Sequence, residues 1–175
     1  MEKPVVKARV KKIGSRVFWV ALVVVTLIGW VRTILFLDDY IETPKTFRGE
    51  GYTITLNDEF DVEQGDNWEV VYDGRKALAM LYKQSKESLP EIASALDYAR
   101  QLHKNCEYEK SEVMETDGLT YYDYYLSWNG RDYTYRVVTY EASDVYWFIQ
   151  FATYSEDFSE VESQIVTWAK SFRVE

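Results

Sequence analysis

One uninterrupted apolar run dominates the hydrophobic pattern of the chain, and it lies at residues 17–37. The only charged residue within the run is Arg32. About 20 helical residues span the roughly 30 Å hydrocarbon layer of a bilayer, where only a helix satisfies its own backbone polar groups. The run therefore predicts a single transmembrane helix. Trp19 and Trp30 lie near its two ends, at the depth that indole rings prefer.

Beyond residue 50 the pattern changes to short runs in which apolar and polar residues alternate, which predicts strands. The predicted strands are 51–56, 68–72, 77–84, 108–115, 119–128, 133–140 and 145–154. Dipeptides that favour tight turns separate several of them, namely Asp73-Gly74, Asp117-Gly118 and Asn129-Gly130. The run at 145–154 is apolar on both faces, so it predicts a central strand that is covered from both sides.

Two segments have the three-and-four spacing of amphipathic helices. The first begins at Ser88, which has Glu91 three residues further on as in a capping box, and ends near Asn105. The second runs from about Ser155 to Phe172. One helix on each side of an antiparallel sheet would bury every apolar face. The sequence therefore predicts an α+β domain of three layers.

Charge is divided sharply by the apolar run. Residues 1–37 carry seven Lys and Arg against one acid, whereas the rest of the chain carries 13 Lys and Arg against 28 Asp and Glu. Because basic residues that flank a spanning helix stay in the cytoplasm, the acidic part should lie outside. The expected organisation is a basic cytoplasmic tail (1–16), a transmembrane helix (17–37), a linker (38–50) and an extracytoplasmic domain (51–175). So acidic a domain is a poor partner for nucleic acid.

A cleaved signal peptide shares the basic start and the apolar core of this pattern. Cleavage needs small residues before the cut, and 33–42 offers mainly large or charged ones, which favours a retained anchor. Cys106 is the only cysteine in the chain. The domain can therefore form no internal disulfide, and its core alone must stabilise it.

The order of these elements resembles the PsbP-like fold, which is shared by PsbP and DcrB-type bacterial lipoproteins. The resemblance covers about Gly51–Glu175 and is carried by GYTITL, by the capped helix after the first hairpin and by three late strands. Its most telling part is VYWFIQFATYSEDFSEVESQIVTWAKSFRVE, an apolar strand, a short acidic break and an amphipathic helix. The resemblance implies a non-enzymatic module that assists or binds partners at a membrane.

Residues with catalytic or metal-binding potential are few. His103 and Cys106 lie three apart at the end of the first predicted helix, but with no second histidine or cysteine they indicate packing rather than a site. An acidic loop at 58–66 has oxygen ligands suited to calcium but lacks the residue order of a calcium loop. No phosphate loop, nucleophile elbow or zinc motif occurs, so the sequence predicts no cofactor, no resident metal and no enzyme.

An aromatic strand offers the best candidate interaction surface. Tyr121, Asp123 and Tyr125 alternate along 119–128 and so project from one face of that strand. Tyrosines around an acid suit a protein or glycan partner, whereas tyrosines that fill two sheet cores would explain the same pattern. The surface therefore stays a hypothesis beside a packing alternative.

These observations predict a single-pass cell-membrane protein, typical of a bacterial envelope, that displays a non-enzymatic accessory or adaptor domain to an envelope or membrane partner. Two other interpretations remain open. One is an extracytoplasmic sensor of a ligand or cation. The other is an envelope hydrolase with paired carboxylates such as Asp61 and Asp123.

Overall fold

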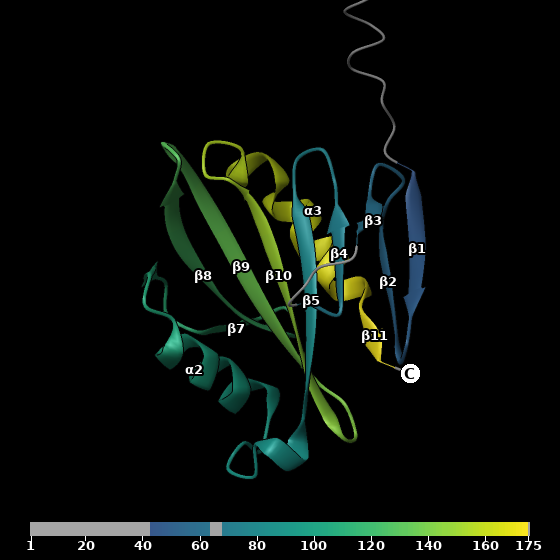
Figure 1. Cartoon of the computed structure of the whole chain (residues 1–175), viewed down its shortest axis with the longest axis vertical. Coiled ribbons are helices and arrows are strands. Elements are labelled where there is room, and N and C mark those ends of the chain that lie inside the picture. Colours follow the sequence, from purple (N-terminus) through teal and green to yellow (C-terminus); the bar gives the residue numbers. More distant parts are fainter. Residues whose placement is uncertain (1–42, 64–67, 175) are drawn as a thin grey trace, which may run out of the picture. The chain divides into compact units, whose positions relative to one another are not determined.

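Two antiparallel sheets and two α-helices make up the described part of the chain (Figure 1). The computed structural model describes residues 43–63 and 68–174. The predicted tail (1–16), transmembrane helix (17–37) and residues 38–42 of the predicted linker lie outside this part. Within the described residues, no helix has the length and apolar character needed to cross a bilayer.

The larger sheet has eight strands, in the order β3-β4-β5-β10-β9-β8-β6, and β7 also pairs with β8. Its strands are β3 (Asp61–Glu63), β4 (Val70–Asp73), β5 (Leu78–Ser85), β6 (Glu109–Lys110), β7 (Met114–Thr116), β8 (Leu119–Trp128), β9 (Arg131–Glu141) and β10 (Val145–Tyr154). The strand that is apolar on both faces, β10, is paired on both sides, with β5 and β9. The prediction of a central strand is confirmed. The single strand predicted at 108–115 is instead two short strands, β6 and β7.

The smaller sheet has three strands, β1 (Pro44–Gly49), β2 (Tyr52–Asn57) and β11 (Arg173–Val174). The linker prediction is therefore wrong over β1. Only Phe47 of this strand is apolar and buried, so alternation gave no signal, and pairing with β2 places Phe47 opposite Ile54. β11 is too short for any periodic pattern.

The first helix begins later than the sequence predicts. Residues Lys86–Ser88 form a 3₁₀ helix (η1), and α2 spans Ala95–Asn105. Ser94 is its cap, because its Oγ accepts the Asp97 N–H at 3.1 Å and donates to the Asp97 carboxylate at 2.8 Å. The cap prediction at Ser88 is wrong, since Ser88 ends η1 and Leu89, which lies in a buried cluster with Tyr98, has a non-helical backbone conformation (φ −133°, ψ 57°). The predicted end at Asn105 is confirmed.

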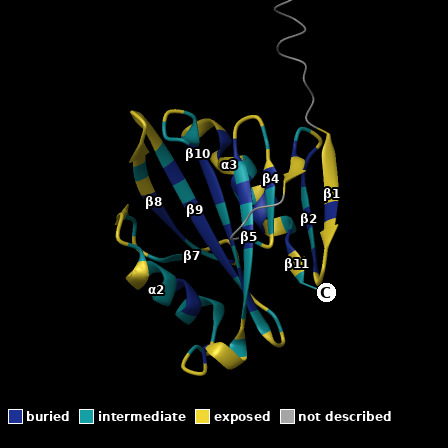
Figure 2. Ribbon diagram, viewed as in Figure 1, coloured by how far each residue is buried: buried dark blue, intermediate teal, exposed yellow. Residues whose placement is uncertain are grey.

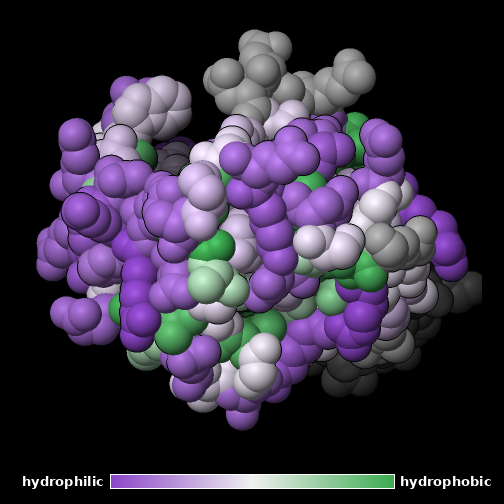
Figure 3. Space-filling model, turned by 90° about the horizontal axis from the view of Figure 1, so that it is seen from below, coloured by the Kyte–Doolittle hydropathy of each residue, from purple (hydrophilic) through white to green (hydrophobic). Residues whose placement is uncertain are grey.

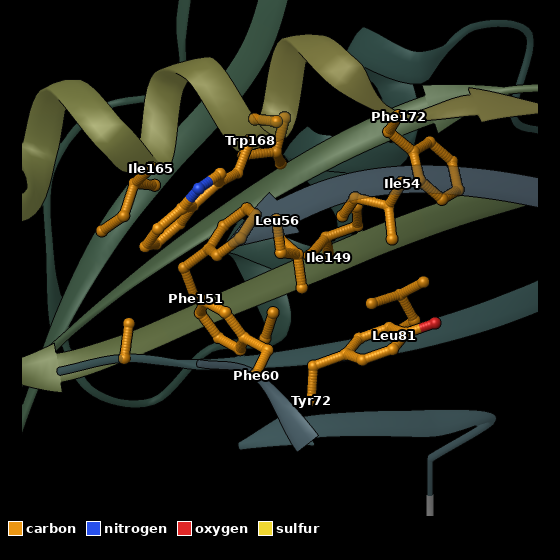
Figure 4. Close-up of a cluster of buried hydrophobic side chains, with 14 of the residues drawn as sticks. Ile54, Leu56, Phe60, Tyr72, Leu81, Ile149, Phe151, Ile165, Trp168 and Phe172 are labelled. Carbon is orange, nitrogen blue, oxygen red and sulfur yellow. The ribbon is translucent and has the colours of Figure 1, made fainter. Parts of the chain in front are cut away.

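The second helix, α3 (Phe158–Ser171), follows its predicted stripe closely. Val161, Ile165 and Trp168 are buried, and the last stripe residue, Phe172, is buried just beyond the helix. α3 and the smaller sheet pack on one face of the larger sheet and enclose the main core (Figure 4). α2 covers part of the opposite face. The predicted α+β arrangement of three layers is confirmed, with the smaller sheet as an addition.

Exposure differs between the two sheets. β1 is exposed over most of its length, whereas β10 is buried along most of its length (Figure 2). On the side seen from below, hydrophilic residues predominate and hydrophobic residues form small patches among them (Figure 3).

Replacing Ile165 by Ala tests the main core. Ile165 is fully buried between α3 and the sheets, so the substitution should lower the free energy of unfolding by about 2–5 kcal/mol. Thr167 lies on the exposed side of the same helix, and Thr167→Ala should change the free energy of unfolding by less than about 0.5 kcal/mol. Urea unfolding followed by circular dichroism measures both. Equal losses would contradict the assigned orientation of α3.

Two serine substitutions test where α2 begins. Ser94→Ala removes the side chain that caps the helix and should cost about 1 kcal/mol. Ser88→Ala removes only an exposed hydrogen bond to the Ser85 carbonyl and should cost less than about 0.5 kcal/mol. The same unfolding measurement compares them, and the reverse order would place the cap at Ser88.

Candidate functional site

The acid of the predicted surface lies in a buried ion pair. Asp123 on β8 is directly opposite Arg136 on β9, and the two side chains form a bidentate pair with both N–O distances at 2.8 Å. Arg136 also donates to Glu162 of α3 at 2.9 Å. Arg136 is 3% exposed and Asp123 is 6% exposed. The guanidinium therefore ties α3 to the centre of β8 and β9.

Two aromatic rings enclose the same guanidinium. Its carbon lies 4.6 Å from the ring centre of Tyr121 and 5.0 Å from that of Phe158. Burial acts to lower the pKa of Arg136, but the hydrogen bonds and charges of Asp123 and Glu162 outweigh it and raise the pKa further. Arg136 is thus a fixed cation that the fold compensates fully, in the arrangement that a buried charge requires.

The structure thus divides the three residues of the predicted surface. Tyr121 packs against the main core and Arg136, and both carboxylate oxygens of Asp123 are occupied. Tyr125 is 43% exposed. Asp123 and Tyr121 have structural contacts that leave neither at the centre of an open surface. Tyr125 remains available to a partner.

A different aromatic surface lies on the opposite face of the larger sheet. α2 covers this face near Tyr122 and Val137, where the Thr139 hydroxyl donates to the Ala95 carbonyl of the helix at 2.9 Å. Toward the β8–β9 hairpin, no described element lies over the face (Figure 1). We call this area the open tyrosine face. It is formed by Tyr108, which is 49% exposed, by the half-buried Tyr133, Tyr135 and Tyr154, and by Tyr124, which is buried.

The rings of the open tyrosine face form one continuous row of contacts. Tyr124 and Tyr135, opposite each other on β8 and β9, stack in parallel with their centres 4.6 Å apart. Tyr108 stacks on the other side of Tyr124 at 5.5 Å. Tyr133 continues the row, 6.3 Å from Tyr135 and 5.1 Å from Tyr154 on β10. Rings held by neighbours on several strands form a rigid platform.

The chemistry of this platform is aromatic and neutral. Burial raises the pKa values of Tyr124 and Tyr135, with the neighbouring tyrosines adding to the effect, so both phenols stay protonated at physiological pH. Arg131 lies over the Tyr154 ring at 5.2 Å and donates to its hydroxyl at 2.6 Å. Trp128, at the end of β8, is 63% exposed.

A shallow hollow of about 310 Å³ adjoins the tyrosines. Tyr133, Tyr135 and Tyr154 line one side of it, and the β4–β5 turn with Arg75 lines the other. Neutral rings, hydroxyl groups and a nearby guanidinium suit the burial of apolar and hydrogen-bonding groups of a partner. They offer no nucleophile with an adjacent base.

The remaining sequence candidates have structural contacts. His103 Nε2 lies 2.9 Å from the Ser111 carbonyl, and its ring packs edge-on against Tyr122. Cys106 is the residue after α2 and is half-buried. The prediction of an acidic loop is wrong over Asp61–Glu63, which pair with β4 as strand β3, and Asp58 accepts the Thr43 N–H at 3.2 Å. Across 43–63 and 68–174, no three His, Cys, Asp or Glu residues gather as a metal site.

The strand order separates Asp61 and Asp123, the example of paired carboxylates that the sequence offered. Asp61 is on β3 at one edge of the larger sheet, and four strands lie between it and Asp123 on β8. With strands about 4.8 Å apart, the two carboxylates are on the order of 20 Å from each other. Paired glycosidase carboxylates are about 5–9.5 Å apart, so these two cannot share a substrate bond.

The fold has known counterparts. The solution structure of cyanobacterial PsbP (CyanoP) from Synechocystis sp. PCC 6803 is similar over 78% of this chain and 95% of its own, with 15% identity and a TM-score of 0.51. The Ran-binding protein Mog1p of Saccharomyces cerevisiae is similar over 76% of this chain and 96% of its own, with 12% identity and a TM-score of 0.52. No family model and no curated protein matches the sequence.

These likenesses define the class of fold. The described domain has the α+β fold of PsbP-like proteins, as the resemblance of the sequence implied. Identities this low show the fold alone, and a fold hosts many functions. The function must therefore be argued from the surfaces of this chain.

Removing the buried cation tests its structural role. Arg136→Met leaves Asp123 buried without a partner and should lower the free energy of unfolding by about 3–5 kcal/mol. Combining it with Asp123→Leu should restore most of the loss, because no buried unpaired charge then remains and the half-exposed Glu162 carboxylate is solvated. Lys86→Ala, which removes an exposed ion pair with Glu141, should cost less than about 1 kcal/mol. Urea unfolding measures all three, and a stable Arg136→Met variant would contradict the structural role.

Proposed function

We propose that this chain is a non-enzymatic accessory protein that binds a protein partner through its open tyrosine face. The observation that carries the proposal is the row of stacked tyrosines on a sheet face that α2 only partly covers. The PsbP-like fold supports an accessory module, since one structure that shares it is that of a Ran-binding protein. The partner of this chain need not be Ran, since the residues of the open tyrosine face determine which protein binds.

The shape of the surface favours a protein over a small molecule. Ligand sites usually enclose most of a ligand in a deep, mainly apolar pocket. The open tyrosine face is instead a row of rings spread over three strands, with only a shallow hollow beside it. Tyrosine supplies rigid contact area and a hydroxyl group at low entropic cost, which is why binding surfaces of antibodies are rich in it.

The charge of the chain excludes one rival partner. Stacked aromatic rings also bind single-stranded nucleic acid, but such sites need a positively charged groove along the backbone. Outside residues 1–37, acids outnumber Lys and Arg by 15. Repulsion of phosphates would oppose nucleic-acid binding, so a protein surface is the better partner.

The proposal includes a membrane location. The apolar run at 17–37 would anchor the chain, and its basic flank would keep the N-terminus in the cytoplasm. β1 begins at Pro44, only seven residues beyond the run, so the domain would sit close to the bilayer. A partner embedded in the same membrane would then be within reach.

Site-specific photo-crosslinking in the native cells tests the proposal with the full chain. A photoreactive residue in place of Tyr133 should crosslink to one partner, because this position lies within the open tyrosine face. The same residue in place of Thr167, on the exposed side of α3, is the matched control. Identical products from both positions, or none from Tyr133, would contradict the proposed face.

Affinity for the purified partner gives the second measurement. Replacing Tyr133 and Tyr154 together by Ala should weaken binding by about tenfold or more, since aromatic anchors dominate interface energies. Thr167→Ala should leave the affinity unchanged. The free energy of unfolding of each variant is measured alongside, so that lost binding is separated from lost folding. An unchanged affinity of the double variant would exclude the open tyrosine face.

A further inference from the structure

A separate cleft of about 360 Å³ lies where the smaller sheet meets the first strands of the larger one. Residues of β1 to β5 and of β10 line it. This volume lies within the range of about 300–1,000 Å³ that is typical of small-ligand sites. The cleft shares no lining residue with the open tyrosine face or its hollow, so it can be considered independently of the proposed function.

The floor of the cleft is aromatic and rigid. Tyr52, Tyr72 and Trp147 are each less than 5% exposed. The hydroxyl groups of Tyr52 and Tyr72 are hydrogen-bonded at 2.9 Å, and the Tyr52 ring packs 5.1 Å from that of Trp147. Gly49 permits this packing, because a Cβ there would lie within 2.5 Å of the Tyr52 ring. The floor is thus preformed.

The rim of the cleft has an excess of negative charge. Glu50, Glu63 and Glu69 line it against Arg48 and Lys83, and Lys83 is paired with Glu69 at 3.5 Å. Within the described residues, Glu50 and Glu63 form no ion pair. Carboxylates around aromatic rings attract cations. Among the described residues, no three acids gather closely enough to hold a bare metal ion.

The chain already places one ammonium group over this floor. Lys83 Nζ lies 5.8 Å from the centre of the Trp147 ring, within the distance at which a cation is attracted to an aromatic face. The Lys83 side chain is only partly buried, so it can move aside. An external ammonium compound would take the same position and compete with it.

The acidic rim favours a ligand with a positive charge, and a buried hydrogen-bond donor favours a ligand that also carries an acceptor. Trp147 Nε1 is buried and has no hydrogen-bond acceptor in the described structure. An unpaired buried N–H costs free energy and is uncommon in folded proteins. Because the Trp147 side chain lines the cleft, an oxygen atom of a bound ligand would supply the missing acceptor. We propose that the cleft binds a small ammonium compound that carries a hydroxyl or ether oxygen, an amino alcohol such as choline.

Titration of choline chloride into the full chain in detergent without ammonium groups tests this site. Choline should raise the thermal midpoint, because a ligand that binds only the folded state stabilises it. Tetramethylammonium lacks the oxygen and should bind about tenfold more weakly, whereas sodium chloride and glycerol at equal concentrations should give no shift. Equal shifts with choline and sodium chloride, or no shift at all, would overturn the proposal.

Three variants locate the binding. Glu50→Gln with Glu63→Gln should weaken choline binding by about tenfold, since this neutralises the two rim carboxylates that form no ion pair within the described residues. Lys83→Met should strengthen binding, because the competing internal ammonium group is gone. Glu115→Gln, on β7 far along the strand order, is the charge control and should leave it unchanged. Strong binding by the double Gln variant, or weaker binding by Lys83→Met, would exclude this cleft.

Lipid nanodiscs distinguish a free ligand from a lipid headgroup. In discs of phosphatidylglycerol, added choline should raise the thermal midpoint as in detergent. In discs of phosphatidylcholine, a further shift with added choline indicates a free ligand, whereas a raised midpoint that choline no longer changes indicates that headgroups occupy the cleft. Both results support an amino-alcohol site, and failure of choline in phosphatidylglycerol discs would contradict it.

Discussion

The central strand β10 determines the architecture, because it is apolar on both faces and must be covered on both. Ile149 and Phe151 point toward α3 and the smaller sheet, whereas Tyr146 and Phe148 point toward α2. A strand of this kind is stable only between two layers, and each layer then needs its own amphipathic element. The pairing of β10 with β5 on one side and β9 on the other extends the same requirement to its neighbours.

The two faces of the larger sheet are not covered to the same extent. On one side the 14-residue α3 is joined by the smaller sheet, and together they enclose the main core. On the other side the 11-residue α2 leaves the region toward the β8–β9 hairpin without cover from any described element. Tyrosine suits that uncovered region, since its ring packs on the sheet while its hydroxyl group meets water. A surface available for binding thus arises from a helix that is shorter than the sheet.

Long periodic elements could be predicted from the sequence, and short or paired ones could not. The ten residues of β10 and the stripe of α3 are specified by local alternation or helical spacing. β1 depends on β2 for its conformation, and the start of α2 depends on the burial of Leu89, so neither leaves a local pattern. The PsbP-like arrangement followed from the order of the elements, which is why it survived these local errors.

The candidate surface was harder to predict for a related reason. Alternation along β8 separates Tyr121, Asp123 and Tyr125 from Tyr122 and Tyr124, but it does not say which face a helix covers or how far. Nor does it pair Asp123 with Arg136, since strand register decides that contact. The Asn129-Gly130 hairpin is the one sequence signal that could have placed the two residues opposite each other.

The position of β1 has a mechanical consequence. It is the first described strand, it pairs with β2 alone, and it supplies part of the wall of the cleft. A pulling force applied along the backbone from the N-terminal side would act on Pro44 at the start of β1. It would separate the six-residue β1 from β2 before it acted on β10. The cleft would lose a wall while the large sheet stayed intact, so pulling force and occupancy of the cleft would oppose each other.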